Sequence, residues 1–149
     1  MQSSGIHLWL VLWKAYESVR AHALRHIHGL GLGFSEFAVL EALLHKGPTP
    51  VNVIGEAVHL TSGSITTAID RLEAKGLVAR GDHPTDRRAR VVHLTASGRQ
   101  LIQKAFEEHT QAMEAATAGL TPDERGAAVA LLKKLGLKAR ADLGADGRK

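Results

Sequence analysis

Apolar residues recur every three or four positions over most of the chain, which is the spacing of helices that bury one face. The first such repeat covers residues 6–28, and a glycine-rich stretch ends it. Ser35 is expected to cap a second helix of about ten residues. A short third helix is expected over about 51–58, with inward-facing residues Val53, Ile54, Ala57 and Val58.

The fourth helix is predicted to run from a cap at Thr61 or Ser62 to about Lys75. Its apolar residues follow the spacing i, i+3, i+4 and i+7, and they are Ile65, Ala68, Ile69 and Leu72. The pattern then changes to β-prone residues over 77–80 and 90–94, separated by a polar and basic segment. This change predicts a two-stranded hairpin with an exposed tip.

Two long helices are expected to complete the chain. Thr95 caps the first, which covers about 96–118. The second opens with Thr121 as cap, Pro122 at the first helical position and Glu124 three residues after the cap. The tail from Gly144 is polar and is expected to fray. With no internal repeat and no long linker, we expect one domain over 1–149, mainly α with a small β-hairpin.

Three helices followed by a hairpin is the element order of a winged helix-turn-helix, here over 35–95. The fourth helix is then the recognition helix, and the wing covers about 81–90. Opposite its apolar stripe, the recognition helix carries small and hydroxyl residues that can approach base edges and phosphates. Its candidate DNA-binding residues are Ser62, Gly63, Ser64, Thr66, Thr67 and Arg71.

The wing carries the densest positive charge in the chain. Between Arg80 and Arg90 there are four arginines, and the candidates for DNA contact are Arg87, Arg88 and Arg90. Arginine at the tip of a narrow ribbon suits the minor groove, where the potential is most negative. Asp86 is expected to brace the Arg88 guanidinium through a charge-assisted hydrogen bond. The alternative is that these arginines only solvate an exposed hairpin.

Composition limits the classes of protein that fit this pattern. The 149 residues are 44% hydrophobic and 23% charged, which is typical of a folded domain. The chain has no cysteine, which excludes disulfides, thiolate zinc sites and thiol redox switches. A net charge of +4 is compatible with a polyanionic partner. The apolar run at residues 6–13 is too short for a bilayer span, so we expect a cytoplasmic protein.

Two segments resemble the multiple-antibiotic-resistance (MarR) family of transcriptional regulators. They are IDRLEAKGLVAR at residues 69–80 and DRRARVVHLT at residues 86–95, the latter closed by Ser97 and Gly98. The resemblance covers nearly the whole chain and implies a homodimer that reads a pseudo-palindromic operator. It implies that the helices over 6–28 and 96–142 form the dimerisation region. It also places the family's wing arginine at Arg88, its bracing acid at Asp86 and its base and phosphate contacts between Ser62 and Arg71.

Within the resembling family, repression is the commoner activity, and we expect a repressor. The peroxide-sensing branch of the family requires a reactive cysteine in the first helix, which this sequence lacks. Dimerisation also follows from the sequence, because the first and last helices carry more apolar surface than one small winged helix can cover. The apolar residues in question are Ile6, Leu8, Leu10, Val11, Leu12, Val19, Leu24 and Ile27 in the first helix, and Ala127, Val129, Leu131, Leu132, Leu135 and Leu137 in the last.

A stripe on the first helix is a candidate ligand site. Trp9, Trp13, Tyr16 and Arg20 follow the spacing i, i+4, i+7 and i+11. Aromatic rings ending in a guanidinium suit a small aromatic carboxylate, a kind of effector that the resembling family often binds. The alternative is that the three aromatics form the core of the dimer interface and Arg20 is solvated.

Three histidines raise the question of a metal. His22 and His26 lie one turn apart and His109 lies on an apolar stripe, but no cysteine or carboxylate completes the set. We therefore expect no metal and no cofactor. The sequence also has no nucleophile elbow, phosphate loop or paired catalytic carboxylates, so no enzyme is predicted. The alternative function is a winged-helix protein-interaction module that binds no DNA sequence and does not depend on Arg87 or Arg88.

Overall fold

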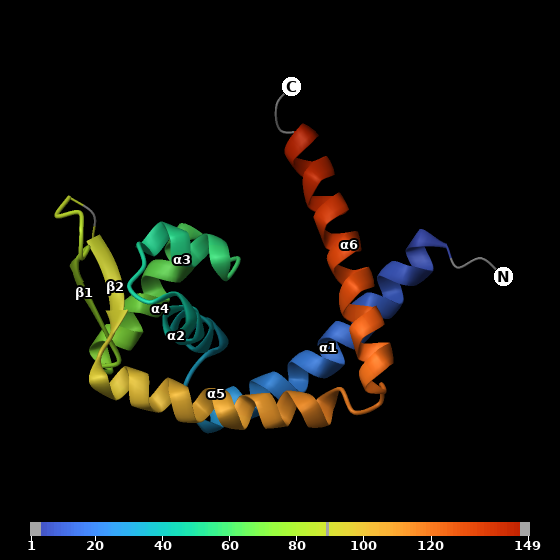
Figure 1. Cartoon of the computed structure of the whole chain (residues 1–149), viewed down its shortest axis with the longest axis horizontal. Coiled ribbons are helices and arrows are strands. Elements are labelled where there is room, and N and C mark those ends of the chain that lie inside the picture. The colour runs from blue at the N-terminus through green and yellow to red at the C-terminus, as the bar shows by residue number, and fades with distance from the viewer. Residues whose placement is uncertain (1–3, 89, 147–149) are drawn as a thin grey trace. The chain divides into compact units, whose positions relative to one another are not determined.

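The computed structural model describes residues 4–88 and 90–146 and confirms the predicted fold class (Figure 1). Over these residues it contains six helices and one two-stranded sheet, which are α1 (Gly5–Gly29), α2 (Phe34–Lys46), α3 (Val51–Ala57), α4 (Ser62–Ala74), β1 (Val78–Asp82), β2 (Arg90–Leu94), α5 (Ala96–Ala116) and α6 (Pro122–Asp146). The chain forms two compact units that divide between Met113 and Glu114. The first unit therefore contains the winged helix together with α1 and most of α5.

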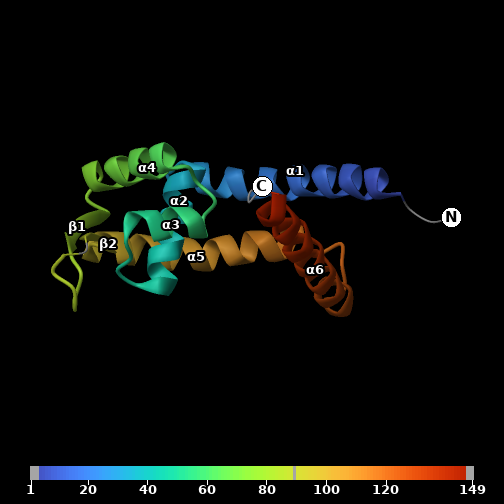
Figure 2. The same cartoon turned by 90° about the horizontal axis from the view of Figure 1, so that it is seen from above.

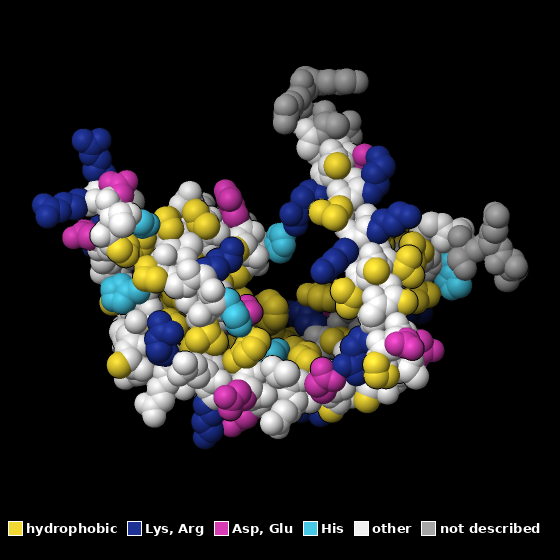
Figure 3. Space-filling view, in the orientation of Figure 1, with side chains coloured by type: hydrophobic (Ala, Val, Ile, Leu, Met, Phe, Trp, Pro, Cys, Tyr) yellow, Lys and Arg dark blue, Asp and Glu magenta, His cyan; other side chains and the backbone are white. Residues whose placement is uncertain are grey.

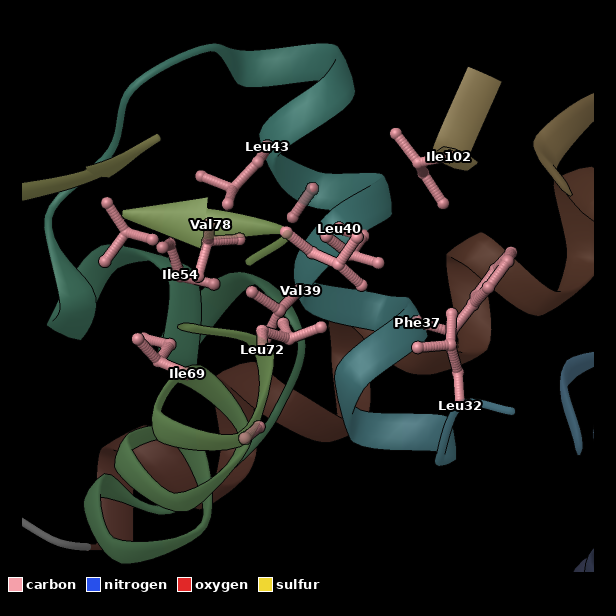
Figure 4. Packing of buried hydrophobic residues seen from close by; sticks show 14 of the residues in the cluster. Leu32, Phe37, Val39, Leu40, Leu43, Ile54, Ile69, Leu72, Val78 and Ile102 are labelled. Carbon is pink, nitrogen blue, oxygen red and sulfur yellow. The ribbon is translucent and has the colours of Figure 1, made fainter. Parts of the chain in front are cut away.

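The first unit is built around one apolar core. The predicted stripe of α4 is buried at all four positions, Ile65, Ala68, Ile69 and Leu72. Figure 4 shows how α2, α3, α4, β1 and α5 contribute side chains to this core, among them Leu40, Leu43, Ile54, Val78 and Ile102. Since burying one such side chain contributes about 1.5–3 kcal/mol, this packing fixes which face of α4 points outward.

The hairpin is antiparallel, and its register pairs Val78 with Leu94 and Asp82 with Arg90. Thr49 joins its edge, because its N–H donates to the Val92 carbonyl (3.0 Å) and its carbonyl accepts from the Val92 N–H (2.9 Å). These bonds tie the connection between α2 and α3 to the base of the wing. Figure 2 shows the hairpin beside the start of α5.

Local signals in the chain set both ends of α4. Its N-cap is Thr61, whose hydroxyl accepts from the Ser64 N–H (3.2 Å). The turn before it places His59 at φ 56°, a left-handed conformation that is uncommon for a residue other than glycine. Gly76 adopts φ 71° directly after the helix, which ends α4 as glycine commonly does.

Three details differ from the sequence-based expectations. Gly33, not Ser35, is the N-cap of α2, because the Glu36 carboxylate reaches back to accept from the Gly33 N–H (3.2 Å). Only one side of α3 meets the core, so Ile54 is buried whereas Val53 and Ala57 are exposed. Helix α6 continues past Gly144 to Asp146, since one glycine costs a helix only about 1 kcal/mol.

A buried carboxylate links α4 to the turn that follows α1. Glu36 is buried, and its Oε2 accepts from Lys75 Nζ at 2.7 Å. Lys75 also donates to the Gly31 carbonyl at 3.1 Å. Because a buried charge is costly without a partner, this pair holds the C-terminal end of α4 against the connection between α1 and α2.

In the described residues, no single helix is long and apolar enough to span a membrane. Only α1 and α2 taken together have the length and composition of a membrane span, and the two helices are bent by 85° relative to each other.

In the second unit, α6 begins as predicted: Thr121 donates its N–H to Glu124 Oε2 (2.8 Å) and its hydroxyl accepts from the Glu124 N–H (3.3 Å).

The start of α5 passes very close to the turn after α4. Thr95 donates its hydroxyl to the Gly76 carbonyl (2.7 Å) and accepts from the Gly98 N–H (3.0 Å). A Cβ atom placed on Gly98 would lie 1.8 Å from the Leu77 carbonyl oxygen. No side chain fits there without moving the backbone.

Gly98→Ala is therefore expected to lower the free energy of unfolding by about 3 kcal/mol, because the added methyl group overlaps backbone atoms. The measurement is chemical denaturation followed by circular dichroism. Gly29→Ala is the matched control, since Gly29 lies in α1 with no atom within 4 Å of the added Cβ. Equal stability of the two variants would contradict the close approach.

Candidate nucleic-acid interface

The outward face of α4 carries the hydroxyl residues that the sequence indicates for DNA contact. Thr66 donates its hydroxyl to the Ser62 carbonyl (2.8 Å), and Thr67 does the same to the Gly63 carbonyl (3.0 Å). Thr61 donates to Ser64 Oγ (3.0 Å). These bonds fix the side-chain rotamers and leave hydroxyl oxygens that can accept hydrogen bonds from a ligand. All of these side chains are exposed.

Two hollows flank α4, and each contains one arginine. The first, of about 590 Å³, contains Arg71 and lies between α4 and the start of α2. The second, of about 550 Å³, is lined by Arg90 and lies among α3, α4 and the first residue of β2. A helix in the major groove has a phosphate backbone on either side. An arginine therefore lies on each side of α4.

The hollows also include residues that the sequence analysis did not select. Gly33, Phe34 and Ser35 line the first, and Pro50 and Asn52 line the second. No local motif marks these residues, because they reach α4 only through the packing of α2 and α3. The Ser35 hydroxyl, expected as a helix cap, instead borders the hollow of Arg71.

The tip of the wing is exposed and positively charged. Figure 3 shows Lys or Arg side chains projecting at upper left, where Figure 1 draws the end of the hairpin. Arg87 and Arg88 are exposed there, and neither forms an ion pair with any residue that the structure describes. Ala89, which follows them, lies outside the described residues.

The role expected for Asp86 changes in one respect. Its Oδ1 accepts from the backbone N–H of Arg88 at 3.0 Å, not from the guanidinium. A carboxylate two residues earlier in the chain forms such a turn readily, because the backbone N–H is closer than the end of a long side chain. Asp86 therefore shapes the tip, while the Arg88 guanidinium extends into solvent.

The other two wing arginines are paired. Arg80 bonds to Asp70 (2.6 Å) and Glu73 (3.0 Å) of α4. Arg90 lies 3.6 Å from Asp82 across the hairpin, and both side chains are exposed. Among the described residues, two of the four arginines, Arg87 and Arg88 at the tip, are thus left without an ion pair. Counting charges along the chain could not reveal this, because the acidic partners come from α4 and the opposite strand.

The aromatic stripe of α1 lies on its surface. Trp9, Trp13 and Tyr16 are 58%, 52% and 54% exposed, so the interior of a single chain does not cover them. Arg20, the fourth member, is half-buried, with its guanidinium carbon 5.9 Å from the centre of the Phe34 ring. Glu17 lies 3.9 Å from Arg20, which is a weak surface pair. Arg20 thus differs from the three aromatic residues in contacting α2 through Phe34.

A cavity of about 240 Å³ lies among α1, α2 and α5, and its lining includes Ile27, Phe34, Phe37, Ala38, Glu41, Phe106 and His109. It contains all three phenylalanines of the chain. The sequence analysis did not identify this cavity, since helical periodicity indicates that a residue points inward but not that space remains beside it. Arg20 connects to it through its contact with Phe34.

Of the three candidate histidines, the structure brings two together. The Nδ1 atoms of His26 on α1 and His109 on α5 lie 3.1 Å apart, so one ring donates and the other accepts. Glu108 lies 3.7 Å from His26 Nε2, and the Phe37 ring centre is 4.8 Å from that of His109. His22 remains exposed and apart. In the described part of the chain, no group of three or more His, Cys, Asp or Glu residues is arranged to hold a metal ion.

Burial lowers the pKa of His109 below its ordinary value, and the neighbouring His26 lowers this pKa further. Both causes favour the neutral imidazole, because desolvation and a nearby positive charge each oppose protonation. The contact between α1 and α5 therefore favours a neutral His109.

Comparisons with known proteins agree with this geometry. The sequence profile of the MarR family matches residues 30–89. The chain is 39% identical to the HTH-type transcriptional regulator MhqR of Bacillus subtilis (strain 168) over 140 residues, which cover 94% of this chain and 97% of that protein.

Two solved structures share the fold. BpsR of Bordetella bronchiseptica, whose DNA binding is regulated by 6-hydroxynicotinic acid, has a TM-score of 0.78 at 29% identity, covering 91% of this chain and 97% of that one. The transcriptional repressor CouR, bound to a 23-mer DNA duplex, has a TM-score of 0.75 at 25% identity, covering 85% and 89% of the two chains.

The histidine pair predicts a pH dependence of stability. Because the pKa of His109 is lower in the folded chain than in the unfolded chain, its contribution is fully present above about pH 6.5 and is lost as the pH falls further. We expect the melting temperature to fall less between pH 7 and pH 5 in His109→Gln than in the control His22→Gln. Identical pH profiles of the two variants would show that the histidine pair does not cause the pH dependence of stability.

Proposed function

Because the chain belongs to the MarR family of DNA-binding transcriptional regulators, we propose that it acts as a homodimeric repressor on a pseudo-palindromic operator. The observation that carries this proposal is the arrangement around α4. Its hydroxyl face points outward, an arginine lies in the hollow on either side, and two unpaired arginines extend from the wing. The repressor CouR, which shares the fold, is bound to DNA in its solved structure.

In this proposal α4 enters the major groove. Ser62, Gly63, Ser64, Thr66 and Thr67 approach base edges and nearby phosphates, and Arg71 and Arg90 contact the two phosphate backbones. Arg87 and Arg88 enter the adjacent minor groove, where arginine responds to the width of the groove. Asp86 holds the backbone of the tip in the required turn. Chromosomal DNA as the target assigns the protein to the cytoplasm.

A second copy of the chain supplies the other half of the operator contact. Residues 35–95 form the DNA-binding part, and the helices within 6–28 and 96–142 form the dimerisation region. The large apolar side chains that a partner would cover are Ile6, Leu8, Trp9, Leu10, Val11, Trp13 and Tyr16 on α1, and Val129, Leu131, Leu132, Leu135 and Leu137 on α6. A soluble monomer rarely exposes so much apolar surface. An operator bound by such a dimer would have half-sites about one helical turn, roughly 34 Å, apart.

The proposed effector is a small aromatic acid. Its ring would occupy the cavity among Phe34, Phe37 and Phe106, and its carboxylate would pair with Arg20, which stacks on Phe34. Regulation of BpsR by 6-hydroxynicotinic acid supports this class of compound. Trp9, Trp13 and Tyr16 then belong to the subunit interface. Such an acid reduces operator occupancy only if it binds the dimer geometry that is incompatible with DNA more tightly.

Selection from a random duplex pool is expected to enrich an inverted repeat, and Arg88→Ala should weaken binding to the selected duplex by about 1–3 kcal/mol. The slope of log affinity against log salt should fall by about one, because one phosphate contact is lost. Fluorescence anisotropy at several salt concentrations measures both quantities. Arg25→Ala, an exposed position on α1, is the control.

If the pool yields no preferred sequence, and every duplex binds alike, sequence-specific regulation is contradicted. The protein-interaction module then becomes the better explanation. Unchanged affinity of Arg88→Ala for an enriched duplex would remove only the wing from the mechanism.

For the effector, 6-hydroxynicotinic acid and benzoate are the probes. Arg20→Gln should raise the concentration needed to release the duplex by about tenfold or more, because a charged hydrogen bond to the carboxylate is lost. Binding of the duplex without effector should not change. Lys14→Gln removes an exposed cation from the same helix and is the matched control. Equal responses of the two variants would contradict the role of Arg20, and no response of the wild type would contradict the aromatic acid.

A further inference from the structure

Arg80 is paired with the recognition helix and not with another residue of the hairpin, among the residues that the structure describes. It stands on β1, and its guanidinium bridges two carboxylates of α4. Nη2 donates to Asp70 Oδ1 at 2.6 Å and Nη1 donates to Glu73 Oε1 at 3.0 Å. The Arg80 backbone N–H also donates to Glu73 Oε2 at 3.3 Å. Both terminal nitrogens are thus engaged within the protein.

The position of Asp70 makes this bridge relevant to DNA. Asp70 lies three residues after Thr67 and four after Thr66, so it shares their outward face of α4. Its side chain is 61% exposed. A helix that enters the major groove with this face brings a carboxylate close to the phosphates, which carry one negative charge per about 1.7 Å of duplex.

The charge of this cluster depends on Arg80. The two carboxylates and the guanidinium together carry one negative charge, and without Arg80 they would carry two. Glu73 is also about half-exposed, whereas the Arg80 side chain is 29% exposed. The arginine is therefore held against the protein while the acidic groups face outward, which is the reverse of a residue placed to contact phosphate.

We propose that Arg80 is a positioning residue for DNA binding, which offsets one of the two negative charges of Asp70 and Glu73 on the recognition helix without contacting DNA itself. It bonds to both exposed carboxylates and reduces their repulsion of the phosphates. Like charges brought together at an interface oppose association, so removal of Arg80 affects binding through Asp70 and Glu73. The role is distinct from that of Arg87 and Arg88, whose guanidinium groups are unpaired in the described chain.

The test is a mutant cycle with anisotropy on one duplex, taken from the selected pool. Arg80→Gln should weaken binding by about tenfold. Adding Asp70→Asn and Glu73→Gln to this variant should restore affinity to within about threefold of the wild type, because the uncompensated charges are gone. In the wild-type background the same two changes should have a smaller effect, since Arg80 already offsets part of the negative charge of the carboxylates.

Arg87→Gln supplies the matched comparison within the wing. Its loss of affinity should not be rescued by Asp70→Asn with Glu73→Gln beyond their effect in the wild type, and its salt slope should fall by about one. Arg80→Lys keeps the charge and should bind more tightly than Arg80→Gln, although an ammonium group lacks the fork that bridges both carboxylates. Circular dichroism and thermal unfolding of each variant establish that it is folded. If Arg80→Gln does not fold, the affinity of Arg80→Lys, with and without Asp70→Asn and Glu73→Gln, is measured in its place.

Loss of affinity in Arg80→Gln that removal of the carboxylates does not rescue would overturn the inference, as would Arg80→Lys binding as weakly as Arg87→Gln. Either result would assign Arg80 to direct DNA contact or to holding the wing in place. A wild-type protein that binds no duplex would instead contradict the proposed function and this inference together.

Discussion

The burial of one face of α4 is the constraint on which the rest of the DNA-binding surface depends. Ile65, Ile69 and Leu72 are almost completely buried against α2, α3 and β1. A helix whose inward face is fixed has a fixed outward face as well. The hydroxyl residues, Arg71 and Asp70 therefore point away from the core as a consequence of packing, before any interaction with DNA is considered. The close contact of Gly98 with Leu77 then sets where α5 leaves the wing.

Charge on this surface is organised by ion pairs across elements. Arg80 forms ion pairs with two carboxylates of α4, and Arg90 lies beside Asp82. Arg87 and Arg88 lie at the tip of the wing. Exposed pairs contribute little to stability. Their importance here lies in which guanidinium groups remain available to a polyanion and in which carboxylates remain uncompensated. The same composition with a different pairing would present a different potential to DNA.

The cavity and the recognition helix are connected through the start of α2. Phe34 lines both the cavity and the hollow that contains Arg71, and it also contacts Arg20. Two residues later, Glu36 holds Lys75 at the end of α4. A ligand that moves Phe34 would therefore act on a segment bonded directly to the recognition helix. This gives the proposed effector response a physical route within one packed unit.

The order of the elements and the inward face of α4 can be predicted from the sequence, because local periodicity, Thr61, Gly76 and the capping residues of α6 act within a few residues of chain. The sequence also identified the exposed hydroxyls of α4 and the wing arginines. Only the tertiary structure decided the pairing of Arg80, the bond from Asp86 to the backbone, the phenylalanine cavity and the meeting of His26 with His109. The Arg80 and histidine contacts join groups from different elements, and the cavity is space left between helices. Local patterns record which side of a helix is buried, but not which partner or void lies opposite it.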